Sequence, residues 1–215
     1  MDTNVFRAWI TSAAGVIEAN RDHLTQLDAA IGDADHGINL ARGFTAVLAA
    51  LDVKPAATPG AVLILTGSTL ISKVGGASGP LYGMAFRRAG QALGAAEDVD
   101  LAALGQALEA ALAGVQQLGA AREGDKTMVD ALAPATRALA KAVAEGATQA
   151  DGLAAAAAAA AEGAAATVSM EARKGRASYL GQRSVGHDDP CAASTVLILA
   201  ALRDAAARGA GTGAP

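Results

Sequence analysis

The sequence predicts an all-α protein. Hydrophobic residues make up 52% of its 215 residues, and most of them are alanine, the strongest helix former. Apolar residues recur at helical spacing, and no stretch alternates convincingly with the two-residue period of a strand. The composition changes nowhere in a way that marks a boundary. We therefore expect one domain over residues 1–208 and a disordered tail over 209–215.

Eight helices are expected, joined by short polar or glycine-rich turns. Pro55 and Pro59 end the second helix, and Pro80 suits the first turn of the fourth. Pro134 should kink or shorten the sixth helix. The run of eight alanines at 154–161 should pack closely against its neighbours. The expected helices span residues 4–24, 37–51, 60–73, 80–94, 101–118, 127–144, 152–170 and 190–208.

Charge and cysteine content exclude several classes of partner. The net charge is −4 and the 17 Lys and Arg residues are spread out, so we expect no direct binding of nucleic acid. Cys191 is the one cysteine, which excludes an intramolecular disulfide and suits a reducing cytoplasm. No segment approaches the roughly 20 apolar residues of a membrane span, and none resembles a signal peptide, so we expect no membrane association.

An aspartate-rich turn near the start carries the clearest chemical signal. Asp28, Asp33 and Asp35 fall within eight positions, and His36 and Asn39 follow directly. Like charges this close repel each other, and a multivalent cation would neutralise them. Hard oxygen ligands without cysteine favour Mg²⁺, Mn²⁺ or Ca²⁺ over Zn²⁺. The alternative is a solvated acidic loop with one capping aspartate, but three carboxylates together favour a metal site.

Two glycine-containing turns are further candidates. Residues 75–80 read Gly-Gly-Ala-Ser-Gly-Pro, and such small residues let a ligand approach the backbone at the start of a helix. The segment lacks the ending of a Walker A loop, so an ordinary turn between helices is the alternative. In residues 124–130, Asp125 is expected to cap the following helix, and a plain capped helix start is as well supported as a binding role.

A long charged segment at 173–193 is the last candidate. Long connections in compact domains tend to be functional, and Arg176 and Arg183 could each pair with phosphate oxygens. The alternative is a solvated charged loop. Cys191 stands at an expected helix start, but no clear His–Cys pair is visible, so we interpret it as a small structural residue.

Taken together, these segments resemble the nucleotide-binding subunit L (DhaL) family of dihydroxyacetone kinases. The resemblance rests on four motifs in family order within residues 28–195. They begin Gly-Asp-Ala-Asp-His-Gly at 32, Gly-Gly-Ala-Ser-Gly-Pro at 75, Gly-Asp-Lys-Thr-Met at 124 and Gly-Arg-Ala-Ser-Tyr at 175. The motifs cover nearly the whole chain, and each is specific by itself.

The resemblance implies an eight-helix antiparallel barrel or bundle, with a nucleotide site in the loops at one end. It implies that Asp28, Asp33 and Asp35 hold two Mg²⁺ ions that bridge the phosphates of ADP or ATP. The implied nucleotide contacts are His36, Gly37, Ile38, Asn39, Ala77, Ser78, Gly119, Met128, Arg176, Asp189, Pro190 and Cys191.

Two positions depart from the family pattern. Family members commonly have glycine where this chain has Ala34, between the second and third aspartates. Alanine is a mild change there if its φ is negative. Family members also commonly have glycine after Pro190, where Cys191 adds a side chain at the edge of the expected pocket.

The implied activity is phosphoryl transfer, with no nucleophilic residue needed on this chain beyond the metal–nucleotide site. The implied partners are a K subunit that holds dihydroxyacetone through a histidine and a phosphohistidine subunit M that reloads bound ADP. The absence of a K domain favours this phosphotransferase-linked form. The alternatives are a subunit of an ATP-dependent kinase for another short ketose such as erythrulose, or an ADP-sensing module that binds a transcription regulator. A homodimer is a further expectation.

Overall fold

The computed structural model describes residues 1–211, and within them it contains nine α-helices, two 3₁₀ segments and no strand. The predicted all-α class is therefore confirmed. The helices are α1 (Thr3–Ala19), α2 (Arg21–Ile31), α3 (His36–Val53), α4 (Pro59–Lys73), α5 (Ser78–Leu93), α6 (Leu101–Gly119), α7 (Val129–Ala144), α8 (Gln149–Ala166) and α9 (Pro190–Gly211), with the 3₁₀ segments η1 (Thr167–Ser169) and η2 (Arg176–Ser184).

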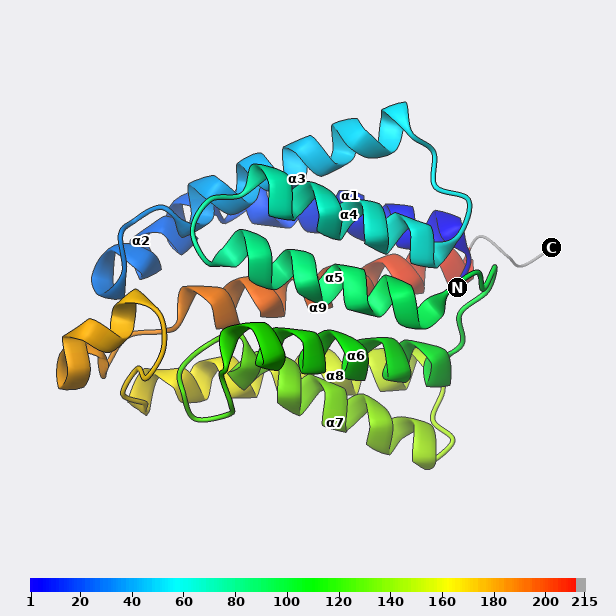
Figure 1. Cartoon of the computed structure of the whole chain (residues 1–215). Helices are drawn as coiled ribbons and strands as arrows, with labels where there is room; N and C mark the ends of the chain where they lie inside the picture. Colours follow the sequence, from blue (N-terminus) through cyan, green and yellow to red (C-terminus); the bar gives the residue numbers. More distant parts are fainter. Residues whose placement is uncertain (212–215) are drawn as a thin grey trace.

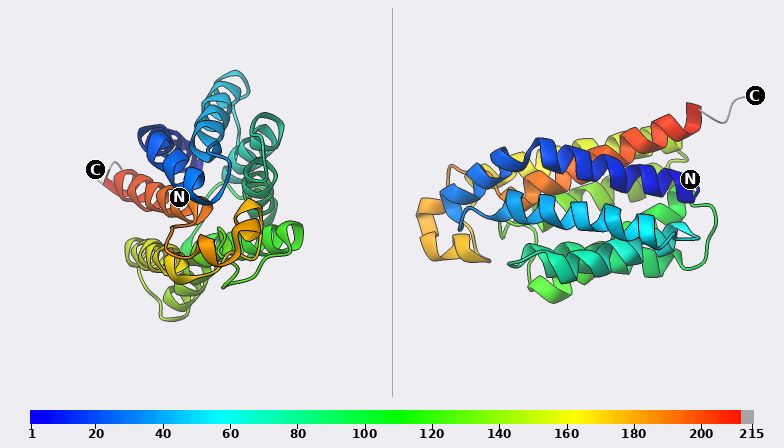
Figure 2. Two further views of the ribbon diagram at one scale, coloured as in Figure 1. Left: turned by 90° about the vertical axis from the view of Figure 1, so that its left-hand side faces the viewer. Right: turned by 90° about the horizontal axis from the view of Figure 1, so that it is seen from above.

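The long helices run back and forth along one axis and form an elongated bundle (Figures 1 and 2). From α3 to α9, each helix packs against its neighbours in the sequence, and α1 packs against both α3 and α9. The α2–α3, α4–α5 and α6–α7 connections lie at the left end in Figure 1, together with η1 and η2. The N-terminus and the α3–α4, α5–α6 and α7–α8 connections lie at the opposite end. The description of this bundle as a barrel stays a prediction.

The prediction of one continuous helix over residues 4–24 is wrong, because α1 ends and α2 begins on either side of Asn20. Asn20 has φ −104° and ψ 9°, and its side-chain amide donates to the carbonyl of Val16 at 2.8 Å. This local bond competes with continuation of the helix. The chain then forms α2, which carries Asp28 on its last turn.

The other expected helices are present, with ends shifted by a few residues. Helix α7 continues through Pro134 to Ala144, so the proline does not shorten it. The proline cannot donate to the carbonyl of Asp130, and Gly163 of α8 packs against that carbonyl so closely that a side chain there would overlap it. Helix α9 runs to Gly211, so the expected tail is helical over 209–211; residues 212–215 lie outside the described part.

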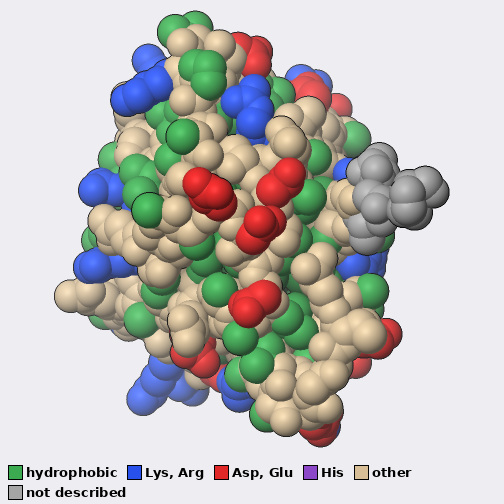
Figure 3. Space-filling model, turned by 90° about the vertical axis from the view of Figure 1, so that its right-hand side faces the viewer, with side chains coloured by type: hydrophobic (Ala, Val, Ile, Leu, Met, Phe, Trp, Pro, Cys, Tyr) green, Lys and Arg blue, Asp and Glu red, His purple; other side chains and the backbone are tan. Residues whose placement is uncertain are grey.

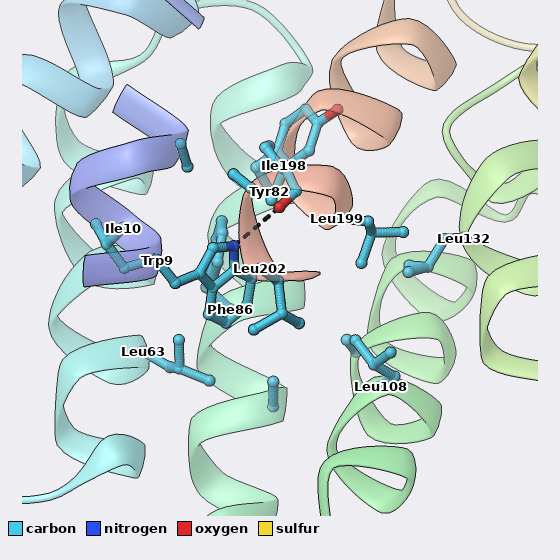
Figure 4. Close-up of a cluster of buried hydrophobic side chains, with 14 of the residues drawn as sticks. Trp9, Ile10, Leu63, Tyr82, Phe86, Leu108, Leu132, Ile198, Leu199 and Leu202 are labelled. Atoms are coloured by element: carbon cyan, nitrogen blue, oxygen red, sulfur yellow. Dashed lines mark hydrogen bonds between the residues drawn. The ribbon is translucent and has the colours of Figure 1, made fainter. Parts of the chain in front are cut away.

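Aromatic residues link the helices in the core. The ring of Trp9 lies 5.8 Å from that of Phe6 and 5.7 Å from that of Phe86, and Phe86 lies 6.3 Å from Phe44. The indole N–H of Trp9 donates to the carbonyl of Ile198 at 2.9 Å, which ties α1 to α9 (Figure 4). The buried tryptophan therefore satisfies its one polar group within the core.

Helices α4 and α5 approach through paired glycines. Gly60 and Gly67 on α4 face Gly90 and Gly83 on α5. A Cβ on Gly67 would lie 2.5 Å from the carbonyl oxygen of Gly83, and one on Gly60 would lie 2.8 Å from that of Gly90. The two backbones therefore touch, and this pairing holds the turn between the helices at the left end in Figure 1.

The expectation that no segment approaches the length of an apolar membrane span is wrong for α8 and α9. Over Gln149–Ser169 and Pro190–Gly209 they are long and apolar enough to cross a membrane by length and composition alone. The reason is their alanine content combined with few charges. Core helices pass the same test, and 56% of the α9 window and 33% of the α8 window are buried inside the protein, so this is weak evidence for a span.

The α4–α5 contact yields a stability prediction. Gly67→Ala should lower the free energy of unfolding by about 1–3 kcal/mol, because the new methyl group meets backbone that cannot move without separating the helices. The matched control is Gly15→Ala on α1, where a Cβ would meet nothing within 4 Å. That change should raise stability by about 0.5–1 kcal/mol. Urea denaturation followed by circular dichroism measures both, and an equal gain in the two variants would contradict the close approach.

Candidate functional site

The four segments that interrupt the helical pattern meet at the left end of the bundle in Figure 1, which faces the viewer in the left panel of Figure 2. They surround a cavity of about 270 Å³. The opposite end, seen in Figure 3, also bears acidic side chains near its centre. Among the described residues, however, only Asp28, Asp33 and Asp35 form a group of three or more potential metal ligands.

Most of the expected site residues line this cavity. Gly37, Ile38 and Asn39 do not, because they lie along α3: Gly37 packs against the backbone of α2, Ile38 is half exposed, and the Asn39 side chain accepts from Arg42. Their proposed nucleotide contacts stay predictions. The expected residues that line the cavity are Asp28, Asp33, Asp35, His36, Ala77, Ser78, Gly119, Met128, Arg176, Asp189, Pro190 and Cys191.

The three aspartates converge as their spacing suggests. One carboxylate oxygen from each lies within 4.8 Å of the others. Oδ2 of Asp28, on α2, accepts from the backbone N–H of Asp35 at 2.8 Å and of His36 at 3.1 Å. This carboxylate therefore caps the start of α3 from a different helix. A side chain on Gly32 would overlap the other oxygen of Asp28, so the turn requires glycine there.

Arg176 extends from η2 to the same cluster. Its Nε donates to Oδ2 of Asp33 at 2.8 Å. The two side chains are 70% and 39% exposed, so the pair contributes little to stability. The ion pair matters because it places the guanidinium of Arg176 beside carboxylates that would otherwise repel one another. The long 173–193 segment thus reaches the aspartate-rich turn, as a binding role requires.

His36 and Tyr82 form a buried polar wall against the start of α9. The imidazole Nε2 lies 2.8 Å from the hydroxyl of Ser194, and the Tyr82 hydroxyl lies 2.7 Å from the same atom and donates to the carbonyl of Cys191. Burial lowers the pKa of His36 to about 4, so the ring is neutral at pH 7. The wall fixes one side of the cavity by hydrogen bonds between neutral groups.

The structure also brings together a His–Cys contact that the sequence does not reveal. Sγ of Cys191 lies 3.7 Å from Nδ1 of His36, although the residues are 155 positions apart. Burial raises the pKa of the Cys191 thiol well above its usual value. A protonated thiol is a poor nucleophile, which agrees with the interpretation of Cys191 as a small structural residue.

Two buried aspartates, Asp130 and Asp189, bond the loops that precede α7 and α9. The prediction that Asp125 caps α7 is wrong. Asp130, not Asp125, accepts from the N–H groups of Gly124 and Thr127 at the entry to α7. Asp125 instead accepts from the N–H of Arg122. Asp189 caps α9 by accepting from Ala192 at 2.7 Å, and burial raises its pKa to about 7.

The remaining walls provide small and apolar surfaces. Helix α5 begins at Ser78, two residues before the expected start, which places the Gly76–Ser78 turn and its free helix N–H groups on the cavity. Leu81, Val115 and Val129 add apolar side chains that are not among the expected site residues. Lys126 and Lys174 stand in two of the candidate segments without an expected role, and both line the cavity.

These features define an all-α protein in which three carboxylates that could hold a hard cation lie beside a helix start suited to anions. A family model described as the DAK2 domain matches residues 30–204, and the chain belongs to this family.

Named relatives agree with this membership. The chain is 42% identical over 198 residues to the ADP-binding subunit DhaL of the PEP-dependent dihydroxyacetone kinase of Escherichia coli (strain K12), covering 92% of this chain and 94% of that protein. It is 37% identical to the ADP-binding subunit DhaL of the PTS-dependent kinase of Lactococcus lactis, covering 96% and 98%. It is also 38% identical to the L-erythrulose 1-kinase of Mycolicibacterium smegmatis, of which it spans 32%.

The fold is similar to a solved kinase. The dihydroxyacetone kinase of C. freundii in complex with AMP-PNP and Mg²⁺ superposes with a TM-score of 0.71 at 28% identity. The match covers 95% of this chain and 34% of that one, so this chain corresponds to about a third of that kinase.

The turn between Asp33 and Asp35 yields a prediction, because Ala34 has φ +61° rather than the negative value that would make alanine mild. The left-handed region costs a non-glycine residue about 1–2 kcal/mol. Ala34→Gly should therefore raise the free energy of unfolding by about 1 kcal/mol in urea denaturation. Ala158→Gly, at an exposed position within α8, should lower it by about 1 kcal/mol. A loss in both variants would show that Ala34 is unstrained.

Proposed function

We propose that this chain is the nucleotide-binding subunit of a dihydroxyacetone kinase, and that it carries ADP and Mg²⁺ in the cavity. The observation that supports this most strongly is the meeting of three carboxylates, a small-residue helix start and an arginine in one cavity. The similarity to ADP-binding DhaL subunits extends over more than nine-tenths of both chains, which supports the same role.

Asp28, Asp33 and Asp35 would hold the metal through hard oxygen atoms. Asp28 is fixed by its bonds to the start of α3, and one of its oxygens lies within 4.8 Å of an oxygen from each of the other two carboxylates. We propose two Mg²⁺ ions, as the resemblance to the DhaL family implies, and each would use one or two of the carboxylates. Bound Mg²⁺ neutralises phosphate charge and orients the phosphoryl group.

The nucleotide would lie across the cavity from the carboxylates to the apolar wall. The start of α5 at Ala77 and Ser78 has no large side chain, so phosphate oxygens can approach its free N–H groups. Leu81, Val115 and Met128 provide an apolar surface for the base. Arg176 can leave Asp33 for phosphate oxygens, because its ion pair is exposed and weak.

The transfer itself would rely on placement and charge. The wall formed by His36 and Tyr82 holds neutral hydrogen-bonded groups, and the Cys191 thiol is protonated. None of these groups is a ready nucleophile, so we infer no covalent intermediate on this chain. The acceptor would be dihydroxyacetone on a separate K subunit, and the donor would be a phosphohistidine subunit M.

Several finer assignments belong to this proposal. One nucleotide-binding domain would span residues 1–208, and the protein would work in the cytoplasm. An ATP-dependent kinase for erythrulose is the second candidate, favoured by the similarity to the L-erythrulose 1-kinase. A transcription regulator as partner and a homodimer are further hypotheses.

Asp33→Asn tests the metal site. Within the described part of the chain, the Asp33 side chain pairs with Arg176 and bonds no backbone group, unlike Asp28, so its loss should leave the fold intact. We expect phosphoryl transfer in the reconstituted system to fall by about 10²–10³-fold, with weaker Mg²⁺-dependent binding of ADP by calorimetry. Asp98→Asn, an exposed change outside the cavity, is the matched control. Full activity of Asp33→Asn would exclude its role.

The released nucleotide separates the two kinase types. The protein should be purified, denatured and its nucleotide identified by chromatography, and exchange with labelled ADP should be timed before denaturation. Retained ADP with slow exchange is expected for the phosphotransferase-linked form, because the nucleotide stays bound while it is reloaded. Rapidly exchanging ATP would support the erythrulose-type kinase instead.

A further inference from the structure

Lys126 is a buried cation surrounded by main-chain carbonyl groups. Its side chain is 1% exposed, and Nζ donates to the carbonyls of Thr167 at 2.8 Å, Met170 at 3.1 Å, Ser184 at 2.8 Å and His187 at 2.6 Å. An ammonium has three N–H bonds, so four carbonyls exceed its donors. The arrangement resembles a carbonyl cage around a monovalent metal ion, in which charge rather than pairing holds the oxygens.

The four carbonyls belong to the two stems of one loop. Thr167 and Met170 precede η2, Ser184 is its last residue and His187 follows it, so the ammonium joins both sides of the segment that carries Arg176. We name this segment, residues 167–187, the arginine loop.

Further bonds support the same closure of the arginine loop. The N–H of Gly186 donates to the carbonyl of Val168 at 2.7 Å, and that of Ala172 donates to the hydroxyl of Ser184 at 2.9 Å. Both bonds join the two stems, so the base of the loop is well ordered by its own contacts.

The tip of the arginine loop is held far less firmly than its base. The Arg176 side chain is 70% exposed, and its ion pair with Asp33 is of a kind that contributes little stability. The backbone that carries the guanidinium is therefore placed by the base of the loop, together with the packing of η2 against α2. Lys126 enters that base from the α6–α7 connection, and it also lines the cavity.

We propose that Lys126 is a positioning residue whose ammonium acts as a built-in cation, gathering both stems of the arginine loop and so setting Arg176 beside the aspartate cluster. The cage itself stands on the geometry alone. Its consequence for phosphoryl transfer rests on the function proposed above, in which Arg176 and the aspartates meet the nucleotide.

The first test removes the ammonium and then supplies it again. Lys126→Ala deletes three methylene groups and the amine, a fragment that n-propylammonium matches. Hydrogen exchange of amides in 167–187 should accelerate about 100-fold or more in this variant, and n-propylammonium should restore protection. 1-Propanol, which has the shape without the charge, should not. Lys141→Ala, an exposed change on α7, is the control. Unchanged exchange, or equal rescue by propanol, would overturn the cage.

The second test is kinetic and distinguishes positioning from general stability. Lys126→Ala should lower kcat by about 100-fold with a smaller change in nucleotide KM, as expected when a group is misplaced by about an ångström. Lys126→Ala and Arg176→Ala combined should be no worse than Arg176→Ala alone, because both act through one guanidinium. Additive losses would overturn the positioning role.

A second variant and a readout without nucleotide distinguish failure of the cage from failure of folding or of the proposed function. Should Lys126→Ala fail to fold, Lys126→Gln keeps two N–H donors without the charge and should still loosen the arginine loop; normal exchange in that folded variant would overturn the proposal. The exchange experiment needs no nucleotide, so it can succeed even if the proposed kinase function fails. Loss of activity in Asp33→Asn with normal exchange in Lys126→Ala would retain the function and reject this inference.

Discussion

The carboxylate of Asp28 is the constraint on which the rest of the site depends. It lies at the end of α2, and one of its oxygens accepts from the first N–H groups of α3. The same group therefore closes the turn and points into the cavity with the other two aspartates. Because a helix start carries partial positive charge, it offsets some of the repulsion that three converging carboxylates create. Because Asp28 takes part in both, the turn and the aspartate cluster form together.

The rest of the cavity is built by long-range contacts that meet around the start of α9. Tyr82 from α5 and His36 from α3 meet the hydroxyl of Ser194, while Asp189 caps the helix. These groups are buried, and each has a partner. Unpaired groups there would be costly, so the wall has little freedom to rearrange. Arg176 differs from this wall, because its side chain is exposed and, within the described residues, is held only by an ion pair with Asp33.

Sequence patterns predicted what depends on local spacing. Helical periodicity and prolines located most helices, and three aspartates within eight positions located the cluster. The break at Asn20 was missed, because a single asparagine can lie within a helix or end one. The cap by Asp130 and the His36–Cys191 contact depend on which segments meet in three dimensions, so no spacing reveals them. Lys126 was read only as part of a motif, since its four partners lie 41–61 positions away.

The aspartate cluster and the Lys126 cage differ in their electrostatics: the first gathers carboxylates, and the second gathers carbonyls around a lysine ammonium. The carboxylates line the open cavity, where in the proposed function they would exchange Mg²⁺ and respond to a bound nucleotide. The carbonyls carry only partial charge and are buried, so one permanent cation suffices to hold them. Burial lowers the pKa of Lys126, which is the cost of placing an ammonium there, while the nearby negative charges of Asp188 and Asp189 oppose that shift. A covalently attached cation keeps the arginine loop closed at any metal concentration. In the proposed function, only the aspartate cluster would then depend on free Mg²⁺, so the order of the arginine loop would not change with the occupancy of the metal site.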